Sequence, residues 1–292
     1  MAELLPPSNS SPFPATTFLG HLPRLHNKIA LVTGASSGLG RAICLAYAAH
    51  GTKLVVCADL RPESLPTHQD ENVRQTHELV NDKFGEGKAV FVKCDVGNAE
   101  DVKNAVKTAV SLGGRLDIIV NNAGLGTKNR WIRVHELEDD EFDRVMHVNV
   151  RGVYLGCKHA IAQFLEQKPD ETGRRGWIVN VSSMLGYVGI TGGAAAYCAS
   201  KGAVLNMTRQ LAVDYAKDKI HCNALCPGFT KTSMTRENFS NEAVNAEMIA
   251  TTPWGEWGNV ADVAKGAVFL ASDDAAWVTG VGLPVDGGYL AQ

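Results

Sequence analysis

A tyrosine and a lysine four positions apart, Tyr197 and Lys201, are the side chains of this sequence with the most definite chemistry. Residues at this spacing lie on one face of a helix. A free phenol has a pKa of about 10, which is too high for easy proton exchange at neutral pH. A nearby ammonium group would stabilise the phenolate and lower that pKa, so that Tyr197 could protonate a carbonyl oxygen or take the proton of an alcohol. Alone, such a pair is common on helices and does not establish a function.

A glycine-rich segment at Thr33–Gly40 indicates a second kind of chemistry. It follows an apolar run that predicts a strand and opens a run that predicts a helix. Glycines there permit a tight turn, close approach of the backbone to a pyrophosphate, and packing of the helix on the strand. The free N–H groups and the dipole of the helix N-terminus favour phosphate anions. The segment therefore predicts a dinucleotide site with contacts from Gly34, Ser36, Ser37, Gly38, Leu39 and Gly40.

An aspartate, Asp59, follows the second predicted strand, nineteen residues after Gly40. Its carboxylate can accept hydrogen bonds from the hydroxyls of the adenosine ribose and would repel a 2′-phosphate. No Arg or Lys occurs within residues 35–39 to balance that phosphate. NAD is therefore favoured over NADP, but Arg61 lies close enough in sequence to offset the carboxylate, so NADP stays possible. A solvated loop aspartate is the alternative interpretation.

The segments that must position these residues alternate between short apolar runs and helical stretches. The predicted strands are Lys28–Thr33, Lys53–Ala58, Ala89–Cys94, Leu116–Asn121, Gly176–Ser182, Ile220–Cys226 and Val281–Val285. Most are continuously apolar, as in strands that are covered on both faces. The predicted helices are Leu39–His50, Glu71–Phe84, Ala99–Ser111, Asp139–Gln167, Ala196–Lys217 and Val260–Ala271. This alternation predicts an α/β fold: a single Rossmann-type, doubly wound parallel sheet of about seven strands with helices on both faces.

The chain is expected to form one domain. Residues 1–26 hold several Pro and Ser and predict an extended N-terminal arm, while residues 27–292 form a single dinucleotide-binding and catalytic domain. Two segments interrupt the alternation: a glycine-rich loop at Gly186–Gly193, and residues 230–258, which carry Trp254 and Trp257. Long ordered loops in compact domains often cover a site, so residues 230–258 are predicted to be a substrate lid loop.

Further motifs accompany these signals in a fixed order. They are Asn121-Asn122-Ala123-Gly124, then Asn149 within His147–Gly152, then Ser182-Ser183 at a strand end. Together with the glycine-rich segment and the tyrosine–lysine pair, they resemble the single-domain branch of the short-chain dehydrogenase/reductase family. The likeness extends from Asn27 to Gly288, and five motifs in the right order and spacing make it specific.

The resemblance implies catalytic roles at the matching positions. Ser183 would hydrogen-bond the substrate oxygen, and Tyr197 would act as the acid or base. Lys201 would hold the ribose and tune the tyrosine, and Asn149 would position a water that links Lys201 to solvent. Ser183 is chosen over Ser182 because Ser183–Gly186 fits the Ser-x-x-Gly pattern of the family, although its separation from Tyr197 is one residue longer than expected.

Cofactor contacts carry over from the resemblance in the same way. Asp95 and Val96 would meet the adenine, and Asn122, Ala123 and Gly124 would line the sugar. The segment Pro227–Thr232 matches the family's stretch beside the nicotinamide amide, with Pro227, Gly228, Thr230 and Thr232 as contacts. Tyr197 and Lys201 would also touch the cofactor. The ending Thr279–Gly288 is interpreted as part of the fold.

Composition narrows the class of protein further. The 45% hydrophobic and 20% charged residues suit a large core with a charged surface, and a formal net charge of −3 without basic clusters argues against a nucleic-acid partner. No apolar stretch is long enough to span a bilayer and no secretion signal is evident, so a cytoplasmic location and no membrane partner are expected. The seven cysteines are predicted to be reduced and mostly buried, and because no second cysteine pair lies near Cys222 and Cys226, no metal site is predicted.

The predicted function is NAD(P)-dependent interconversion of a secondary alcohol and a ketone by hydride transfer. The apolar and aromatic residues of 230–258 favour a hydrophobic substrate, possibly cyclic, such as a steroid-like, terpenoid or polyketide molecule. Met184, Tyr187, Phe229 and Met234 are candidates for the pocket wall; Trp254 could face the substrate, and Trp257 is interpreted as structural. A non-redox isomerase, dehydratase or cyclase and a dinucleotide-sensing protein are the alternatives, and a homodimer or homotetramer is expected.

Overall fold

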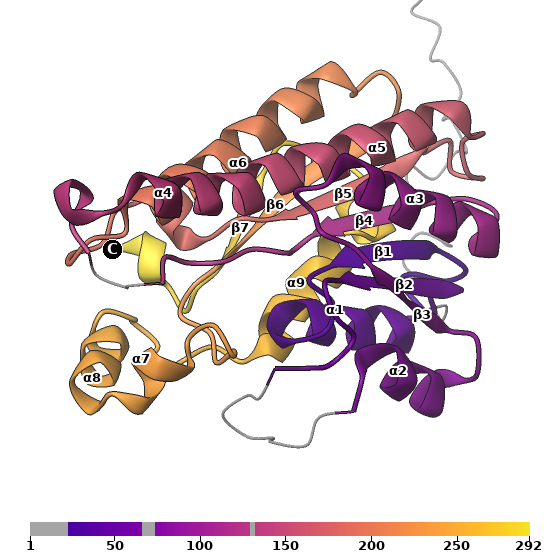
Figure 1. Cartoon of the computed structure of the whole chain (residues 1–292). Helices are drawn as coiled ribbons and strands as arrows, with labels where there is room; N and C mark the ends of the chain where they lie inside the picture. Colours follow the sequence, from indigo (N-terminus) through magenta and orange to yellow (C-terminus); the bar gives the residue numbers. More distant parts are fainter. Residues whose placement is uncertain (1–22, 66–73, 129–131) are drawn as a thin grey trace, which may run out of the picture.

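The computed structural model of the protein describes residues 23–65, 74–128 and 132–292, and a seven-stranded parallel sheet forms its centre (Figure 1). The strands are β1 (Ile29–Thr33), β2 (Leu54–Asp59), β3 (Ala89–Lys93), β4 (Ile118–Asn121), β5 (Gly176–Val181), β6 (Ile220–Pro227) and β7 (Gly282–Val285). Their order in the sheet is β3-β2-β1-β4-β5-β6-β7. The predicted doubly wound parallel sheet is confirmed, with all seven strands in the expected places.

The order of the strands reverses direction between β1 and β4, which are neighbours in the sheet. In an open parallel sheet, the crevice at the carboxyl ends of the strands on the two sides of such a switch point is the usual ligand site. The register pairs Thr33 with Ala58 and Val32 with Val120, so the ends of β1, β2 and β4 lie at one edge. The fold thus brings the glycine-rich segment, Asp59 and the Asn122–Gly124 turn to the same edge of the sheet.

The strands are continuously apolar because both faces of the sheet are covered. Ile29 and Leu31 pack in one core with α3 and α5, whereas Ala30 and Val32, which alternate with them, pack in the other with α1 and α9. Side chains on a strand alternate between faces, so each strand contributes to both cores.

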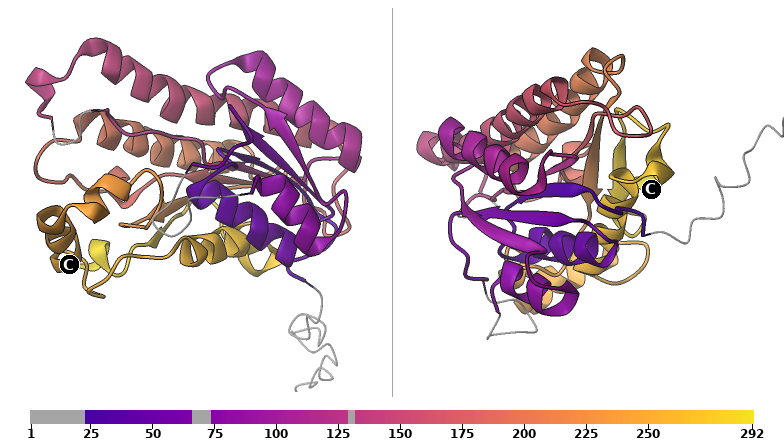
Figure 2. Two further views of the ribbon diagram at one scale, coloured as in Figure 1. Left: turned by 60° about the horizontal axis from the view of Figure 1, so that its bottom comes forward. Right: turned by 90° about the vertical axis from the view of Figure 1, so that its right-hand side faces the viewer.

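The helices form a layer on each face of the sheet, as Figures 1 and 2 show. They are α1 (Gly38–Ala49), α2 (Thr76–Phe84), α3 (Ala99–Gly113), α4 (Asp139–Met146), α5 (Gly152–Glu166), α6 (Ala195–Asp214), α7 (Arg236–Ser240), α8 (Glu242–Ala250) and α9 (Val260–Leu270). Short 3-10 turns lie at Val134–Glu136, Met184–Gly186, Asp273–Ala275 and Tyr289–Ala291. Within the described ranges, no helix has the length and apolar character that crossing a membrane requires.

The helix predicted at Asp139–Gln167 is interrupted in the structure. A π-helical turn at His147–Arg151 separates α4 from α5, and it contains Asn149. A π-turn inserts an extra residue into the helical hydrogen-bond pattern and is often found at functional sites. The amphipathic pattern could not reveal it because the apolar periodicity continues through the turn.

The segment 230–258 was predicted as a loop, and this prediction is wrong in part. It contains the short helices α7 and α8, which lie beside the carboxyl edge of the sheet in Figure 1. The two helices are five and nine residues long, and mainly their packing stabilises them. Sequence periodicity over so few residues is too short to predict a helix.

The boundary of the N-terminal arm also differs from the prediction. Residues 1–22, most of the predicted arm, lie outside the described residues, as does the start of the helix predicted at Glu71. Residues 23–26, however, belong to the domain, because Leu25 is fully buried and its N–H donates to the carbonyl of His50.

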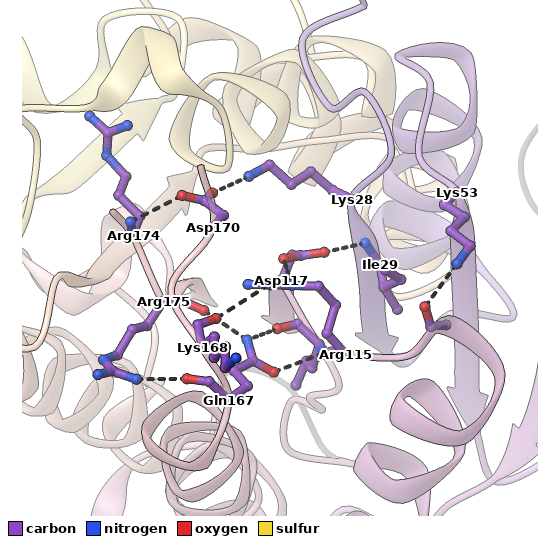
Figure 3. A network of polar contacts seen from close by, with 12 residues as sticks. Lys28, Ile29, Lys53, Arg115, Asp117, Gln167, Lys168, Asp170, Arg174 and Arg175 are labelled. Carbon is purple, nitrogen blue, oxygen red and sulfur yellow. Dashed lines mark hydrogen bonds and ion pairs between the residues drawn. The ribbon is translucent and has the colours of Figure 1, made fainter. Parts of the chain in front are cut away.

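Polar side chains fasten the amino ends of the strands, at the edge opposite the predicted site (Figure 3). The Asp117 carboxylate, just before β4, accepts hydrogen bonds from the Ile29 N–H at 2.8 Å and from Arg115 Nε at 2.6 Å. Lys28, just before β1, donates to Asp170 at 2.7 Å, and its ammonium lies 4.2 Å from the ring centroid of Trp177. These contacts link the segments just before β1, β4 and β5 at the amino edge of the sheet.

Candidate active site

A cavity of about 500 Å³ runs along the carboxyl edge of the sheet. It brings together most residues that the sequence assigned to the cofactor, although they come from six separate segments. Those in its wall are Gly34, Ser37, Gly38, Leu39, Asp59, Asp95, Val96, Asn122, Ala123, Gly124, Tyr197, Lys201, Pro227, Gly228, Thr230 and Thr232. Leu60, Leu65 and Cys94 also line it and were not predicted, because nothing in their sequence context separates them from ordinary core or loop residues.

Three predicted site residues, Ser36, Gly40 and Asn149, do not line this cavity. The Ser36 hydroxyl donates to the carbonyl of Arg61 at 2.6 Å, so this side chain holds the loop after β2. A Cβ on Gly40 would lie 2.1 Å from the carbonyl oxygen of Gly34, so this glycine permits the close packing of α1 on the turn. Ser36 and Gly40 therefore shape the site from behind its wall.

The turn before α1 is built on two glycines in the left-handed conformation. Gly34 and Gly38 have φ values of +63° and +52°, a conformation that favours glycine. A Cβ on Gly34 would also lie 2.8 Å from the Asn122 side chain, which itself donates to the Thr33 carbonyl at 2.8 Å. Ser37 precedes the helix but its side chain does not cap the first-turn N–H groups, and no acidic residue occupies that turn. These N–H groups remain available to an anion.

Asp59 ends β2 and its carboxylate lies in the cavity wall. One carboxylate oxygen accepts the N–H of Ser36 at 2.9 Å and the other accepts the N–H of Leu60 at 2.7 Å. Each oxygen keeps a further lone pair, so the group can still accept bonds from a ligand hydroxyl. Arg61, whose side chain was a possible counter-charge, is exposed, and only its carbonyl has a hydrogen-bond partner in the described part of the chain.

Lys201 is almost completely buried at the floor of the cleft, with 4% of its surface exposed. Its Nζ donates to the carbonyl of Val181 at 2.9 Å and lies 5.6 Å from the centroid of the Tyr197 ring. Burial lowers the pKa of Lys201 to about 8, since the charged form loses its hydration. The group is still mostly an ammonium at pH 7. The structure thus places this charge beside the phenol, as the helical spacing predicts.

The two serines at the end of β5 have different surroundings. The Ser182 hydroxyl donates to the Lys201 carbonyl at 2.8 Å, so it fastens α6 to the sheet. The Ser183 hydroxyl accepts the N–H of Leu185 at 3.1 Å, and its own proton is left for another acceptor. Ser183, unlike Ser182, also lines a second cavity, described below. These contacts favour Ser183 as the residue that meets a substrate.

The side chain of Asn149 is fully buried behind the cleft. Its Oδ1 accepts the N–H of Leu125, and its Nδ2 donates to the Leu125 carbonyl and to the Ser200 hydroxyl, at 2.9, 2.9 and 3.0 Å. The amide therefore ties the turn after β4 to α6, next to Lys201. The water predicted from the family resemblance is not tested by these contacts.

A second, smaller cavity of about 140 Å³ adjoins the cleft. Its wall is largely apolar and includes Met184, Leu185, Ile190, Phe229, Met234 and Met248. Ser183 and Tyr197 line both cavities, so they stand at the junction.

Three of the four candidates for the pocket wall, Met184, Phe229 and Met234, lie in the wall of the smaller cavity. Tyr187 does not, because its hydroxyl donates to the Gly282 carbonyl at 2.9 Å. Asn238 and Met248 were missed, since they lie on α7 and α8, where a loop was predicted.

The two tryptophans of 230–258 have opposite environments. Trp257 is buried, packs against Phe229 and Phe239, and donates to Asn245 at 2.6 Å, which confirms its structural interpretation. Trp254 is 79% exposed and lies in neither cavity wall, so the suggestion that it faces a substrate is wrong for this conformation.

All seven cysteines are free thiols, as predicted, and only Cys198 is not buried. Burial raises the pKa of the thiols of Cys94, Cys157 and Cys226 to about 12, which keeps them protonated. Among the residues described, no three His, Cys, Asp or Glu side chains come together as a metal site would require.

Comparison with known proteins fits this geometry. Residues 34–290 match the protein family described as enoyl-(acyl carrier protein) reductase. The 2-(R)-hydroxypropyl-CoM dehydrogenase of Xanthobacter autotrophicus is 38% identical over 265 residues, which span 91% of this chain and 99% of that protein. Cyclopentanol dehydrogenase of Comamonas sp. is 36% identical over 270 residues, or 92% and 99% of the two chains. The chain belongs to the short-chain dehydrogenase/reductase family.

A solved structure of this family shows the same arrangement of elements. It is described as a 2-deoxy-D-gluconate 3-dehydrogenase from Agrobacterium tumefaciens with bound NADP, and it is 33% identical. The match has a TM-score of 0.78 and covers 94% of this chain and all of that one. As a member of the short-chain dehydrogenase/reductase family, the protein is an NAD(P)-dependent oxidoreductase that interconverts an alcohol and a ketone.

Proposed function

We propose that the protein is an NAD-dependent dehydrogenase of a small, apolar, cyclic secondary alcohol. The observation that carries this proposal is the apolar cavity of about 140 Å³ that shares Ser183 and Tyr197 with the dinucleotide cleft. An apolar cavity of about 150 Å³ in another protein holds benzene, so this one matches a single six-membered ring. A steroid-like skeleton would have to extend beyond it, which favours smaller rings among the hydrophobic molecules considered from the sequence.

The proposed chemistry uses three side chains at the junction of the two cavities. Tyr197 takes the proton of the alcohol during oxidation and returns one to the carbonyl oxygen during reduction. Ser183 donates its free hydroxyl proton to the same substrate oxygen, and the ammonium of Lys201 stabilises the phenolate that forms. The bound nicotinamide supplies the acceptor or donor of the hydride.

Asn149 is proposed to act indirectly. Its amide holds both backbone groups of Leu125 and the Ser200 hydroxyl, next to the buried Lys201. We propose that the π-turn that contains Asn149 offers a backbone carbonyl to a water that connects Lys201 to solvent. In this proposal the Asn149 side chain fixes the position of the surrounding backbone, and a backbone carbonyl binds the water.

The proposed preference for NAD rests on Asp59. Its carboxylate lies in the cleft wall with lone pairs left for ribose hydroxyls, and a 2′-phosphate there would meet a like charge. The proposed contacts of the phosphates are the N–H groups at the start of α1, including those of Leu39 and Gly40.

Assembly and location complete the proposal. Large apolar side chains are exposed on α5 and α6, including Tyr154 at 51% and Val213 at 75%, and covering them would favour a homodimer or homotetramer. Light scattering coupled to gel filtration measures the mass of the particle; a monomer at micromolar concentration would contradict this part. The free thiols agree with a reducing compartment such as the cytoplasm.

The central experiment measures NADH formation from a panel of secondary alcohols that contains cyclopentanol, cyclohexanol, open-chain alcohols and sugars. We expect the highest kcat/KM for the ring alcohols, and stoichiometric NADH formation, which a non-redox isomerase would not show. Tyr197→Phe should lower kcat by roughly 10²- to 10⁴-fold, as for loss of a general acid or base. The matched control is Tyr187→Phe, which removes a hydroxyl outside both cavities and should leave kcat within about 2-fold. Rapid turnover of sugars with none of ring alcohols would contradict the proposal.

A further inference from the structure

The apolar cavity contains one buried polar side chain without a partner, that of Asn238. This residue lies on α7, is 9% exposed and lines the cavity. Across residues 23–65, 74–128 and 132–292, no hydrogen bond from the Asn238 amide to another protein group is found. A carboxamide has two donor hydrogens and two acceptor lone pairs, and in the described part of the chain none of them is bonded to another protein group.

Two other polar side chains close to Asn238 in the chain already have protein partners. The Thr235 hydroxyl donates to the Thr230 carbonyl at 2.6 Å, and Asn245, on the next helix, accepts the Trp257 indole N–H. An amide among apolar side chains needs a hydrogen-bond partner, and for Asn238 only water or a ligand in the cavity can supply one. Met248 and Phe229, which line the same cavity, are apolar, so an amide at position 238 is unusual in this wall unless a ligand bonds it.

The position of Asn238 relative to the reacting groups defines which part of a ligand it meets. Ser183 and Tyr197 line both cavities, whereas Asn238 lines only the smaller one. The amide therefore faces the part of a substrate that extends away from the reacting carbon. No Lys, Arg, His, Asp or Glu belongs to the wall of that cavity among the described residues, so a charged group would find no counter-ion there.

We propose that Asn238 determines substrate specificity by binding a neutral hydroxyl or carbonyl on the far side of the substrate ring. The inference rests on the proposed function and narrows its substrate class from apolar ring alcohols to ring alcohols with a second, uncharged polar group. A site built to bond such a group discriminates strongly against an analogue that lacks it, because its own buried amide is then left unpaired.

The experiment compares two ketones of nearly equal size, 4-hydroxycyclohexanone and 4-methylcyclohexanone, as substrates for reduction by NADH. The wild-type enzyme should prefer the hydroxyl compound in kcat/KM. Asn238→Leu replaces the amide with an apolar group of similar volume, and it should shift the ratio of the two kcat/KM values toward the methyl compound by about 10- to 100-fold.

A matched variant separates recognition from structural damage. Asn245→Leu makes the same substitution seven residues away, at an amide that bonds Trp257 and lies in neither cavity wall. It should change kcat/KM for both ketones by the same factor. A purely structural role for Asn238 would give this same uniform effect.

Each outcome decides one of the two proposals. An unchanged ratio in Asn238→Leu, with both ketones still reduced, overturns the specificity role and leaves the proposed function standing; it would mean that the amide bonds only water. Failure of the wild-type enzyme to reduce either ketone, while it reduces an unrelated class of carbonyl compound, overturns the proposed function and the specificity role with it.

Discussion

Replacing Lys201 with methionine should make the folded protein more stable at neutral pH while it removes the activity. The ammonium is 4% exposed and its pKa falls to about 8 because burial removes its hydration. The folded state therefore holds this proton less tightly than the unfolded state does. Methionine fills a similar space and carries no charge that must lose its water.

The magnitude follows from the two pKa values. The pKa of Lys201 is about 8 in the folded protein and 10.5 in the unfolded chain. Keeping the side chain protonated in the folded state at pH 7 therefore lowers the free energy of unfolding by about 3 kcal/mol. The substitution also removes the hydrogen bond to the Val181 carbonyl, which contributes about 1 kcal/mol. The net expectation is a gain of about 2 kcal/mol in the free energy of unfolding, or roughly 4 °C in Tm for a chain of this length.

The pH dependence gives the sharper test. Because the pKa of Lys201 is lower in the folded protein, its destabilising effect is fully present below about pH 8. The effect disappears as the pH rises toward 10.5, where the lysine of the unfolded chain also loses its proton. The Tm of wild type should therefore rise relative to that of Lys201→Met between pH 8 and 10.5. Other groups titrate in both proteins and cancel in the difference.

The assay is thermal unfolding of both proteins without cofactor, since bound cofactor stabilises the folded state by itself. Lys217→Met is the matched control: this lysine lies just beyond α6 and is exposed, so its replacement should change Tm by less than about 1 °C. A variant Lys201→Met that is less stable than wild type at pH 7, or a difference in Tm that does not change up to pH 10, would refute the reasoning.

Two further predictions test the cofactor and serine assignments. Asp59→Asn should lower the kcat/KM ratio of NAD to NADP by about 10-fold or more, because the like charge facing the 2′-phosphate is removed; an unchanged ratio in steady-state assays would show that another group sets the preference. Ser183→Ala should lower kcat by about 10²-fold with little change in Tm, since its hydroxyl proton has no partner in the folded protein. Ser182→Ala should instead lower the free energy of unfolding by about 1 kcal/mol, because the bond to the Lys201 carbonyl is lost; reversed effects in the two serine variants would exchange their roles.

Local sequence patterns were sufficient for the framework of this fold. Continuous apolar runs identify β1, β4 and β5 because a strand covered on both faces must be apolar at every position. The turn at Gly34 and Gly38 was also predictable, since a left-handed backbone conformation selects glycine directly. Helical spacing placed Tyr197 and Lys201 on one face, and the other motifs of the chain were needed to assign them a role.

Other features depend on contacts that no local pattern records. The π-turn at Asn149 does not interrupt the apolar periodicity, so the sequence predicted one continuous helix. The helices α7 and α8 are too short to be predicted from propensity, and with them Asn238 was missed. Tyr187 was misassigned because the acceptor of its hydroxyl, the Gly282 carbonyl, lies about a hundred residues away in the chain.

The sequence by itself determined the parallel sheet, the glycine-rich turn before α1 and the placing of Tyr197 and Lys201 on one helical face, because each follows from a local pattern of residues. Only the tertiary structure decided the electrostatics and the shape of the site. The pKa of Lys201 depends on how completely β5 and α6 exclude water from it, and the cavity that Asn238 lines exists only because α7 and α8 lie beside the carboxyl edge of the sheet. Burial and cavity volume arise from residues far apart in the chain, and a one-dimensional pattern carries neither.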